Sequence, residues 1–171
     1  MPLVYYPEAT QGEQGPAGPV GFGASAIYFS TVDQTGTDNS AQAMTVNNTD
    51  WETGVTLVDG SKIKVSATGK YNIQFSAQLN QTNSSATVNI WLAKNGTAID
   101  NSNTKVAITA NNPLVVAAWN IFVSSNVDDY YQIIWSSDSH HTKLEYEPAA
   151  TINSILHPAV PSVIITVNQV G

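Results

Sequence analysis

The amino-acid sequence predicts an all-β fold: an antiparallel jelly-roll sandwich of about eight to ten strands, trimeric, with an extended N-terminal arm. Residues 71–80 alternate apolar and polar side chains without a fault, which is the period of a half-buried strand. Only 11% of the residues are charged, and the abundance of Asn, Thr, Ser and Val suits strands and polar turns better than helices. Glycine recurs at every third position from Gly12 to Gly21, a period that is typical of three chains meeting at one axis.

The composition divides the 171 residues into three parts. Residues 1–11 form a short apolar and aromatic segment, which we expect to be a docking peptide. Residues 12–23 form a collagen-like Gly-x-y segment. Residues 24–171 are long enough to bury one core, and we expect them to form the jelly-roll head that trimerises.

The docking peptide contains the residues predicted to anchor the protein to its partner, namely Leu3, Val4, Tyr5 and Tyr6. This segment is too small to bury itself, and aromatic side chains with a polar tip are enriched where one protein binds another. A frayed chain terminus is the alternative interpretation.

The Gly-x-y segment repeats glycine with period three because the axis of a collagen triple helix has no room for a side chain. The glycines predicted to contact neighbouring chains are Gly12, Gly15, Gly18 and Gly21. So short a run cannot hold three chains alone, and we therefore expect the head to make the trimer. A Pro- and Gly-rich linker is the alternative.

Alternation and turn signals divide the head into strands. The expected strands are residues 26–30, 43–46, 55–58, 63–67, 71–80, 86–92, 104–109, 114–124, 131–135 and 163–167. Residues 33–41 are expected to form a polar loop, and residues 50–54 a turn that contains a tryptophan. Asp59-Gly60 and Asn95-Gly96 have the signature of tight hairpin turns, because glycine readily adopts a positive φ.

Three of the expected strands are apolar on both faces: residues 114–124, 131–135 and 163–167. One face of an antiparallel sheet commonly meets water, so doubly apolar strands indicate that something else covers the second face. A neighbouring copy of the same chain is the simplest candidate. The residues predicted to make these trimer contacts are Val116, Phe122, Ile134 and Ile164.

Segments of the head resemble the tumour-necrosis-factor and complement-subcomponent superfamily. Residues 68–75 resemble the strand of that group in which a glycine precedes a tyrosine and alternating aromatics, and residues 119–123 resemble one of its later inner strands. A short collagen-like run before an all-β domain, and a central apolar C-terminal strand, also resemble that group. The resemblance implies jelly rolls that pack as trimers around an axis. The chain lacks the cysteines of many complement-like domains and has only a short run of triplets, so we expect attachment at close range.

The end of the chain has a second resemblance. Residues 157–170 contain Pro-Ser-Val followed by an apolar strand, and they resemble the closing segment of tail-fibre and head-decoration proteins of bacterial viruses. This resemblance implies a structural protein of a virus particle.

Charge and composition disfavour several classes of function. A net charge of −7 with six Lys and Arg residues provides no basic patch for nucleic acid or another polyanion. The absence of cysteine excludes disulfides and cysteine-based metal sites or nucleophiles. No apolar run is long enough to span a bilayer, and the N-terminus lacks the pattern of a secretory signal, so we expect synthesis in a host cytoplasm and no membrane partner.

Candidate catalytic and metal-binding residues are few. His140 and His141 are adjacent, and adjacent residues on a strand would point to opposite faces, which disfavours a shared metal. We expect both to lie in a solvated loop, and a metal on a three-fold axis is the alternative. Asp128-Asp129 lacks the spaced oxygen ligands of a calcium loop and is expected to be an exposed turn. Glycoside cleavage would need a carboxylate pair drawn from Asp50, Glu52, Glu145 and Glu147, which the sequence does not bring together. We therefore predict no catalytic residue, metal or cofactor.

These observations favour a non-enzymatic structural protein on the outer surface of a virion. The leading expectation is a trimeric capsid decoration protein, of the cement or head-fibre kind, whose N-terminal arm binds the major capsid protein or another virion component. Two alternatives stay open. One is the receptor-binding tip of a tail fibre that holds host surface glycans through exposed Trp, Tyr and Asn, and the other is a surface glycan hydrolase.

Overall fold

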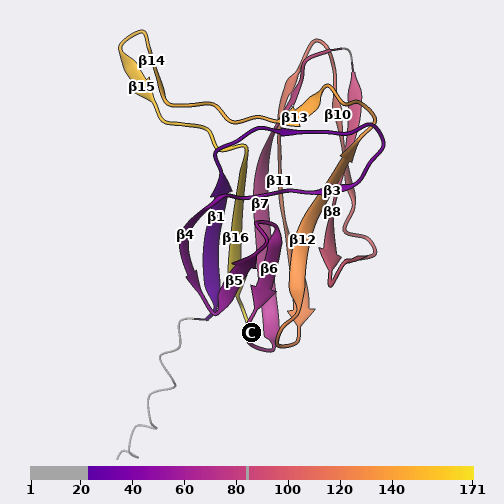
Figure 1. The fold of residues 1–171 in the computed structure, drawn as a ribbon, viewed down its shortest axis with the longest axis vertical. Coiled ribbons are helices and arrows are strands. Elements are labelled where there is room, and N and C mark those ends of the chain that lie inside the picture. Colours follow the sequence, from indigo (N-terminus) through magenta and orange to yellow (C-terminus); the bar gives the residue numbers. More distant parts are fainter. Residues whose placement is uncertain (1–22, 84) are drawn as a thin grey trace, which may run out of the picture.

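The computed structural model describes residues 23–83 and 85–171, and every regular element in that part of the chain is a β-strand (Figure 1). No helix there could therefore span a membrane. Ten of the strands have four or more residues, in agreement with the predicted number. Of the six shorter ones, β13 lies between β2 and β7, and the others lie beside longer strands or in a projecting hairpin. The predicted docking peptide and the predicted glycine contacts of the collagen-like segment lie outside the described residues.

The first sheet, sheet A, contains seven strands and has β7 at its centre. Its order is β2 (Gln34–Thr35), β13 (Thr142–Leu144), β7 (Gly69–Gln81), β16 (Val163–Gln169), β1 (Ser25–Ser30) and β4 (Asn48–Thr53). β11 (Leu114–Ser125) pairs with β7 along its other side and forms an edge of the sheet.

The second sheet, sheet B, also has seven strands, and it packs on sheet A to enclose the core. Its order is β10 (Thr104–Ile108), β8 (Ala86–Lys94), β12 (Tyr130–Ser137), β6 (Lys62–Val65) and β5 (Val55–Val58), with β3 (Gln42–Ala43) beside β12 and β9 (Thr97–Ala98) beside β8. All strand pairs of both sheets are antiparallel, as predicted.

The alternation of β7 explains how the core forms. Its apolar residues, Tyr71, Ile73, Phe75, Ala77 and Leu79, are all buried between the sheets. Burial of the apolar positions of one strand face is the outcome that a period of two predicts. The core tyrosines also satisfy their polar ends, since the Tyr71 hydroxyl donates to the carbonyl of Ala67 at 2.9 Å.

Two predicted elements differ from the structure. Residues 50–54 were expected to be a turn, but Asn48–Thr53 is strand β4, which pairs with β1, and only Gly54 has the positive φ of a turn. The predicted strand 43–46 is a strand only at its start. The Gln34 side chain binds both the amide and the carbonyl of Thr45 at 2.8 Å, so a side chain replaces a neighbouring strand there.

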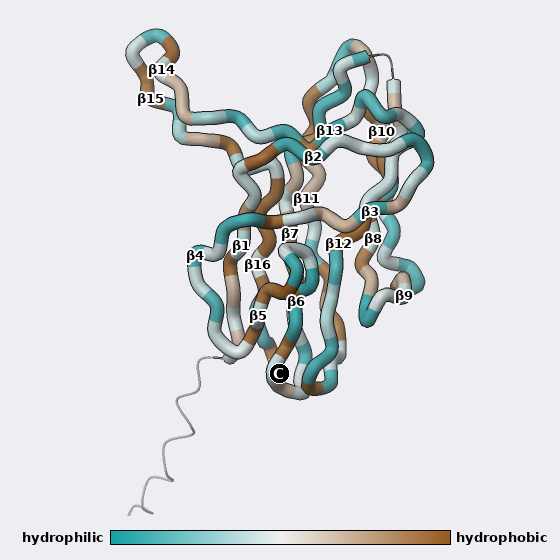
Figure 2. The backbone as a smooth tube through the Cα atoms, in the orientation of Figure 1, coloured by the Kyte–Doolittle hydropathy of each residue, from teal (hydrophilic) through white to brown (hydrophobic). Residues whose placement is uncertain are grey.

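A hairpin that the sequence analysis did not predict projects from one end of the sandwich (Figure 1). It consists of β14 (Ala150–Ile152) and β15 (Ile155–His157), joined by Asn153 and Ser154, which both have positive φ as in a two-residue hairpin turn. Every residue of both strands is exposed. Hydrophobic residues lie at its tip (Figure 2), where Leu156 is 69% exposed.

We predict that the hairpin contributes little to the stability of the sandwich. Replacing residues 150–157 by a short Gly–Ser linker should change the free energy of unfolding by less than about 0.5 kcal/mol, because the removed side chains make no core contact. Ile73→Ala, a buried control, should destabilise the protein by about 2–5 kcal/mol. Urea denaturation of both variants would measure the difference, and a large loss on hairpin removal would contradict the prediction.

Candidate interface on the outer face of sheet A

The outer face of sheet A consists of the side chains of its strands that point away from the core. In antiparallel strands, residues directly opposite each other have their side chains on the same face. One row across the sheet consists of Trp51 of β4, Ile27 of β1, Thr166 of β16, Gln74 of β7 and Asn120 of β11. This outer face is therefore continuous across five strands.

Large apolar side chains are exposed on this face. A second row consists of Phe29, Ile164, Ser76 and Ala118. On the edge strand β11, Leu114, Val116 and Phe122 are 55%, 60% and 64% exposed. Their neighbours across β7 are Asn80, Gln78 and Asn72, which are polar but uncharged.

The outer face carries little charge on β1, β7, β11 and β16, and Lys143 of β13, directly opposite Asn80, is a charged residue at one end of it. Among the outward residues of β1, β7, β11 and β16, Lys70 at one end of β7 is the only charged one. Depletion of charge together with exposed aliphatic and aromatic groups is the character of the centre of a protein–protein interface. The face is thus suited to contact another protein surface and poorly suited to a charged polymer.

The structure brings together three of the four predicted trimer contacts in the head. Val116, Phe122 and Ile164 all lie on the outer face, and Val116 and Ile164 flank β7 from opposite sides. Ile134 lies elsewhere, because β12 belongs to sheet B. It is only partly exposed, next to Ala43 and Trp91 of its own chain. One flat interface therefore cannot include all four residues.

Sequence reasoning missed the part of the outer face that β1 and β4 supply. Trp51 is 49% exposed there, beside Ile27, and Phe29 is next to Ile164. The alternation of residues 26–30 contained the signal for Ile27 and Phe29, because Ala26 and Tyr28 take the buried positions. The sequence analysis did not predict that Trp51 belongs to this face, because it assigned residues 50–54 to a turn.

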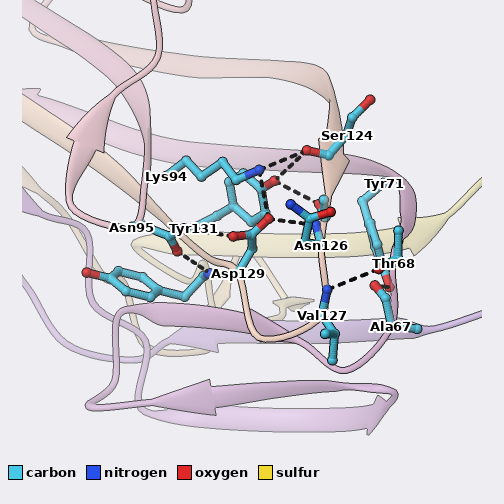
Figure 3. Close-up of polar contacts among 12 residues, drawn as sticks. Ala67, Thr68, Tyr71, Lys94, Asn95, Ser124, Asn126, Val127, Asp129 and Tyr131 are labelled. Carbon is cyan, nitrogen blue, oxygen red and sulfur yellow. Dashed lines mark hydrogen bonds and ion pairs between the residues drawn. The ribbon is translucent and has the colours of Figure 1, made fainter.

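The carboxylate of Asp129, in the turn between β11 and β12, binds two side chains and a backbone amide of the same chain (Figure 3). The Asp129 carboxylate contacts the Lys94 ammonium at 2.7 Å and accepts hydrogen bonds from the Asn95 side chain and the Asn126 backbone amide. The Lys94 ammonium thus occupies the place beside the carboxylate that a bound metal ion would take. The hydrogen bond from Lys94, with the two further donors, lowers the pKa of Asp129 to about 2. Asp129 is buried, although an exposed turn was expected.

The two adjacent histidines lie in an exposed turn before β13, in agreement with the expected solvated loop. Their ring centroids are 4.1 Å apart, and His140 Nδ1 is 3.0 Å from a carboxylate oxygen of Asp38. The hydrogen bond from His140 lowers the pKa of Asp38. Within residues 23–83 and 85–171, no group of three or more His, Cys, Asp or Glu side chains could hold a metal ion.

The carboxylates considered for glycoside cleavage lie at two separate places. Asp50 and Glu52 belong to β4 at one edge of sheet A, whereas Glu145 follows β13 and binds Lys143 at 2.7 Å. β4 pairs with β1, whereas β13 pairs with β7 and β2, so the two groups of carboxylates lie on strands that do not pair with each other.

We predict that the Asp129–Lys94 pair stabilises the fold at neutral pH and fails in acid. Because the pKa of Asp129 lies below that of an unfolded aspartate, its contribution is present above about pH 4 and disappears as the pH falls towards 2. Asp129→Asn should therefore be less stable than the parent at pH 7, and the difference should shrink between pH 5 and pH 2. Denaturant titrations with Lys94→Met as the companion variant would measure it, and a pH-independent difference would refute the prediction.

We also predict that, if the chain associates through the outer face as a trimer, Phe122→Glu prevents this association without unfolding the chain. A carboxylate buried against an uncharged surface loses its hydration without gaining a partner, whereas in the free chain this side chain is in water. Sedimentation velocity should give the 18.2 kDa mass of one chain in place of three times that mass. Val127→Glu, which is similarly exposed but lies on a turn, is the control and should leave the mass unchanged. An unchanged mass for Phe122→Glu would exclude β11 from the interface.

Three solved structures have a similar fold. Murine APRIL at pH 8.0 has a TM-score of 0.52 and 8% sequence identity, and the match covers 85% of this chain and 98% of that chain. Murine APRIL at pH 5.0 has a TM-score of 0.54 and 6% identity, and the match covers 86% of this chain and 99% of that chain. The globular domain of zebrafish complement 1qA protein has a TM-score of 0.52 and 6% identity, and the match covers 86% of this chain and 98% of that chain. No protein-family profile and no curated protein sequence matches the chain. At these identities the likeness shows the fold alone, and the head thus has a jelly-roll fold like that of murine APRIL and the zebrafish complement domain.

Proposed function

We propose that the protein is a non-enzymatic homotrimer that assembles through the outer face of sheet A and decorates the capsid of a virus particle. The observation that supports this most directly is the outer face itself, which is continuous across five strands, nearly uncharged on β1, β7, β11 and β16, and exposes large apolar side chains. A surface of this kind is stabilised by burial against a similar surface, and a second copy of the chain supplies one.

The position of the Gly-x-y segment supports three copies. Glycine at every third residue is required where three chains share an axis. That segment ends at Gly23, two residues before β1, and Ile27 and Phe29 of β1 lie on the outer face. The start of β1 is fixed to the sandwich, because the Ala24 amide donates to the Gln169 side chain and the Gln169 amide donates to the Ala24 carbonyl. The segment therefore ends directly before a strand whose start is fixed to the sandwich and whose outward residues belong to the outer face.

The fold is also consistent with a trimer. The group that the sequence resembles packs its jelly rolls around an axis, and the solved structures of murine APRIL and the zebrafish complement domain have the fold of this head. The residues considered for catalysis are distributed around the molecule and do not converge, which favours a structural or binding role.

The virion role depends on the N-terminal segment and on the resemblance at the C-terminus. Leu3, Val4, Tyr5 and Tyr6 from three chains would bind at one capsid position, on the major capsid protein or another virion component. Three weak contacts then reinforce one another, because binding of the first raises the effective concentration of the others. The chain enters the head at the same end as the C-terminus, opposite the β14–β15 hairpin, so the head would point away from the particle (Figure 1).

Deleting residues 1–11 tests this role. We expect the truncated protein to stay trimeric by sedimentation and to lose binding to particles that lack the endogenous protein. Co-sedimentation with purified particles, followed by cryo-electron microscopy, measures the attachment. Full attachment of the truncated trimer would show that the anchor lies in the head, and a monomeric product would show that the head does not hold the trimer.

A further inference from the structure

A shallow hollow of about 400 Å³ lies on the outward face of sheet B, away from sheet A. Its floor is formed by Asn89 and Trp91 of β8 and Ser136 of β12. Ser136 is directly opposite Asn89 across the two strands, and both alternate with buried residues, so their side chains face outward together. The wall is the loop of residues 98–103, between β9 and β10.

The wall of the hollow is held in place by hydrogen bonds to the floor. Ser102 is 7% exposed, and its hydroxyl lies 3.1 Å from the amide and 3.2 Å from the carbonyl of Leu92, and 2.7 Å from the carbonyl of Ile99. The Asn103 side chain donates to Asn89 Oδ1 at 3.2 Å, which joins wall and floor directly. A loop fixed by a buried hydroxyl needs little ordering when a ligand binds.

The chemistry of the lining identifies a class of ligand. A partly buried indole provides an apolar platform, and amides, a hydroxyl and one carboxylate surround it: the side chains of Asn89, Asn101, Ser136 and Asp100. A sugar ring has the complementary character, because its axial C–H groups form an apolar face and its hydroxyls donate to and accept from amides and carboxylates. We propose that this hollow binds a neutral saccharide, in which the Trp91 indole stacks on the sugar ring and the side chains of Asp100 and Asn101 form hydrogen bonds with its hydroxyls.

Other ligand classes fit the hollow less well. A phosphate or another strong anion would meet the Asp100 carboxylate, and no basic side chain lines the hollow to offset it. A metal ion would need more than one carboxylate or imidazole. The volume is within the range of small-molecule sites, and the hollow is open to solvent, which suits the end of a glycan better than an enclosed metabolite.

The site is independent of the proposed assembly. The core separates the outward face of sheet B from the outer face of sheet A, so burying one leaves the other accessible. A trimer would present three such hollows on its outside, and weak binding at each would combine on a surface with many glycans. The inference therefore goes beyond the proposed function and does not require it.

Binding to the full-length protein tests the inference. The probes are D-galactose, N-acetyl-D-glucosamine and maltose, with N-acetylneuraminic acid as the acidic comparison, measured by saturation-transfer NMR and isothermal titration. We expect saturable binding of at least one neutral sugar and none of the acidic one. Trp91→Ala should weaken binding by about tenfold or more, and Asp100→Ala should also weaken it.

The controls separate loss of binding from loss of folding. Trp51→Ala removes an exposed tryptophan of sheet A and should leave sugar binding unchanged. Trp91→Phe keeps an aromatic platform and should retain part of the affinity, which guards against a Trp91→Ala variant that fails to fold. Absence of saturable binding by the parent, stronger binding of the acidic sugar, or equal affinity of a folded Asp100→Ala and the parent would overturn the proposal. The Asp100→Ala protein should attach to particles normally. Sugar binding therefore tests this inference, whereas the deletion of residues 1–11 tests the proposed function separately.

Discussion

The strict alternation of β7 is the constraint on which both faces of sheet A depend. β7 pairs with β11 along one side and with β16 and β13 along the other, so its register decides which side chains of those strands point inward. A slip of one residue would move Tyr71 and Ile73 towards solvent and Asn72 and Gln74 into the core, because side chains alternate with period two. The core of the sandwich and the uncharged outer face are therefore two consequences of one register.

The outer face has an arrangement that suits a cyclic assembly. In a ring of identical chains, each chain contacts its two neighbours through two different patches. The outer face has one apolar region at β1 and β4, with Phe29 and Trp51, and another on β11, with Val116 and Phe122. β11 is also an edge strand, and an apolar edge left in water is prone to pair with other chains. A closed trimer would cover this edge in each copy and leave none for further growth.

The paired charged groups lie at turns and at the ends of the long strands. Asp129 and Lys94 join the β11–β12 turn to the end of β8, and Asp33, Lys143 and Glu145 form a second group around β13, on the side of β7 that also holds β16. Each carboxylate there has a cationic or hydrogen-bonding partner, which is the condition under which charge near a protein core is tolerated. The outer face is thus free for another chain, and the hollow on sheet B faces solvent on the opposite side.

The sequence by itself determined the fold class and most of the longer strands, because alternation and turn residues are local signals. It predicted residues 71–80 for what is β7, Gly69–Gln81, and it identified Val116, Phe122 and Ile164 as outward apolar residues. It could not separate them from Ile134, because periodicity shows which residues share a strand face but not which sheet that strand joins. It also missed β4, an exposed edge strand whose polar sequence pairs with β1 only in the folded chain. Only the tertiary structure decided the rows of the outer face and the hollow at Trp91, because both depend on register between strands far apart in the sequence and on a loop that folds back onto β8.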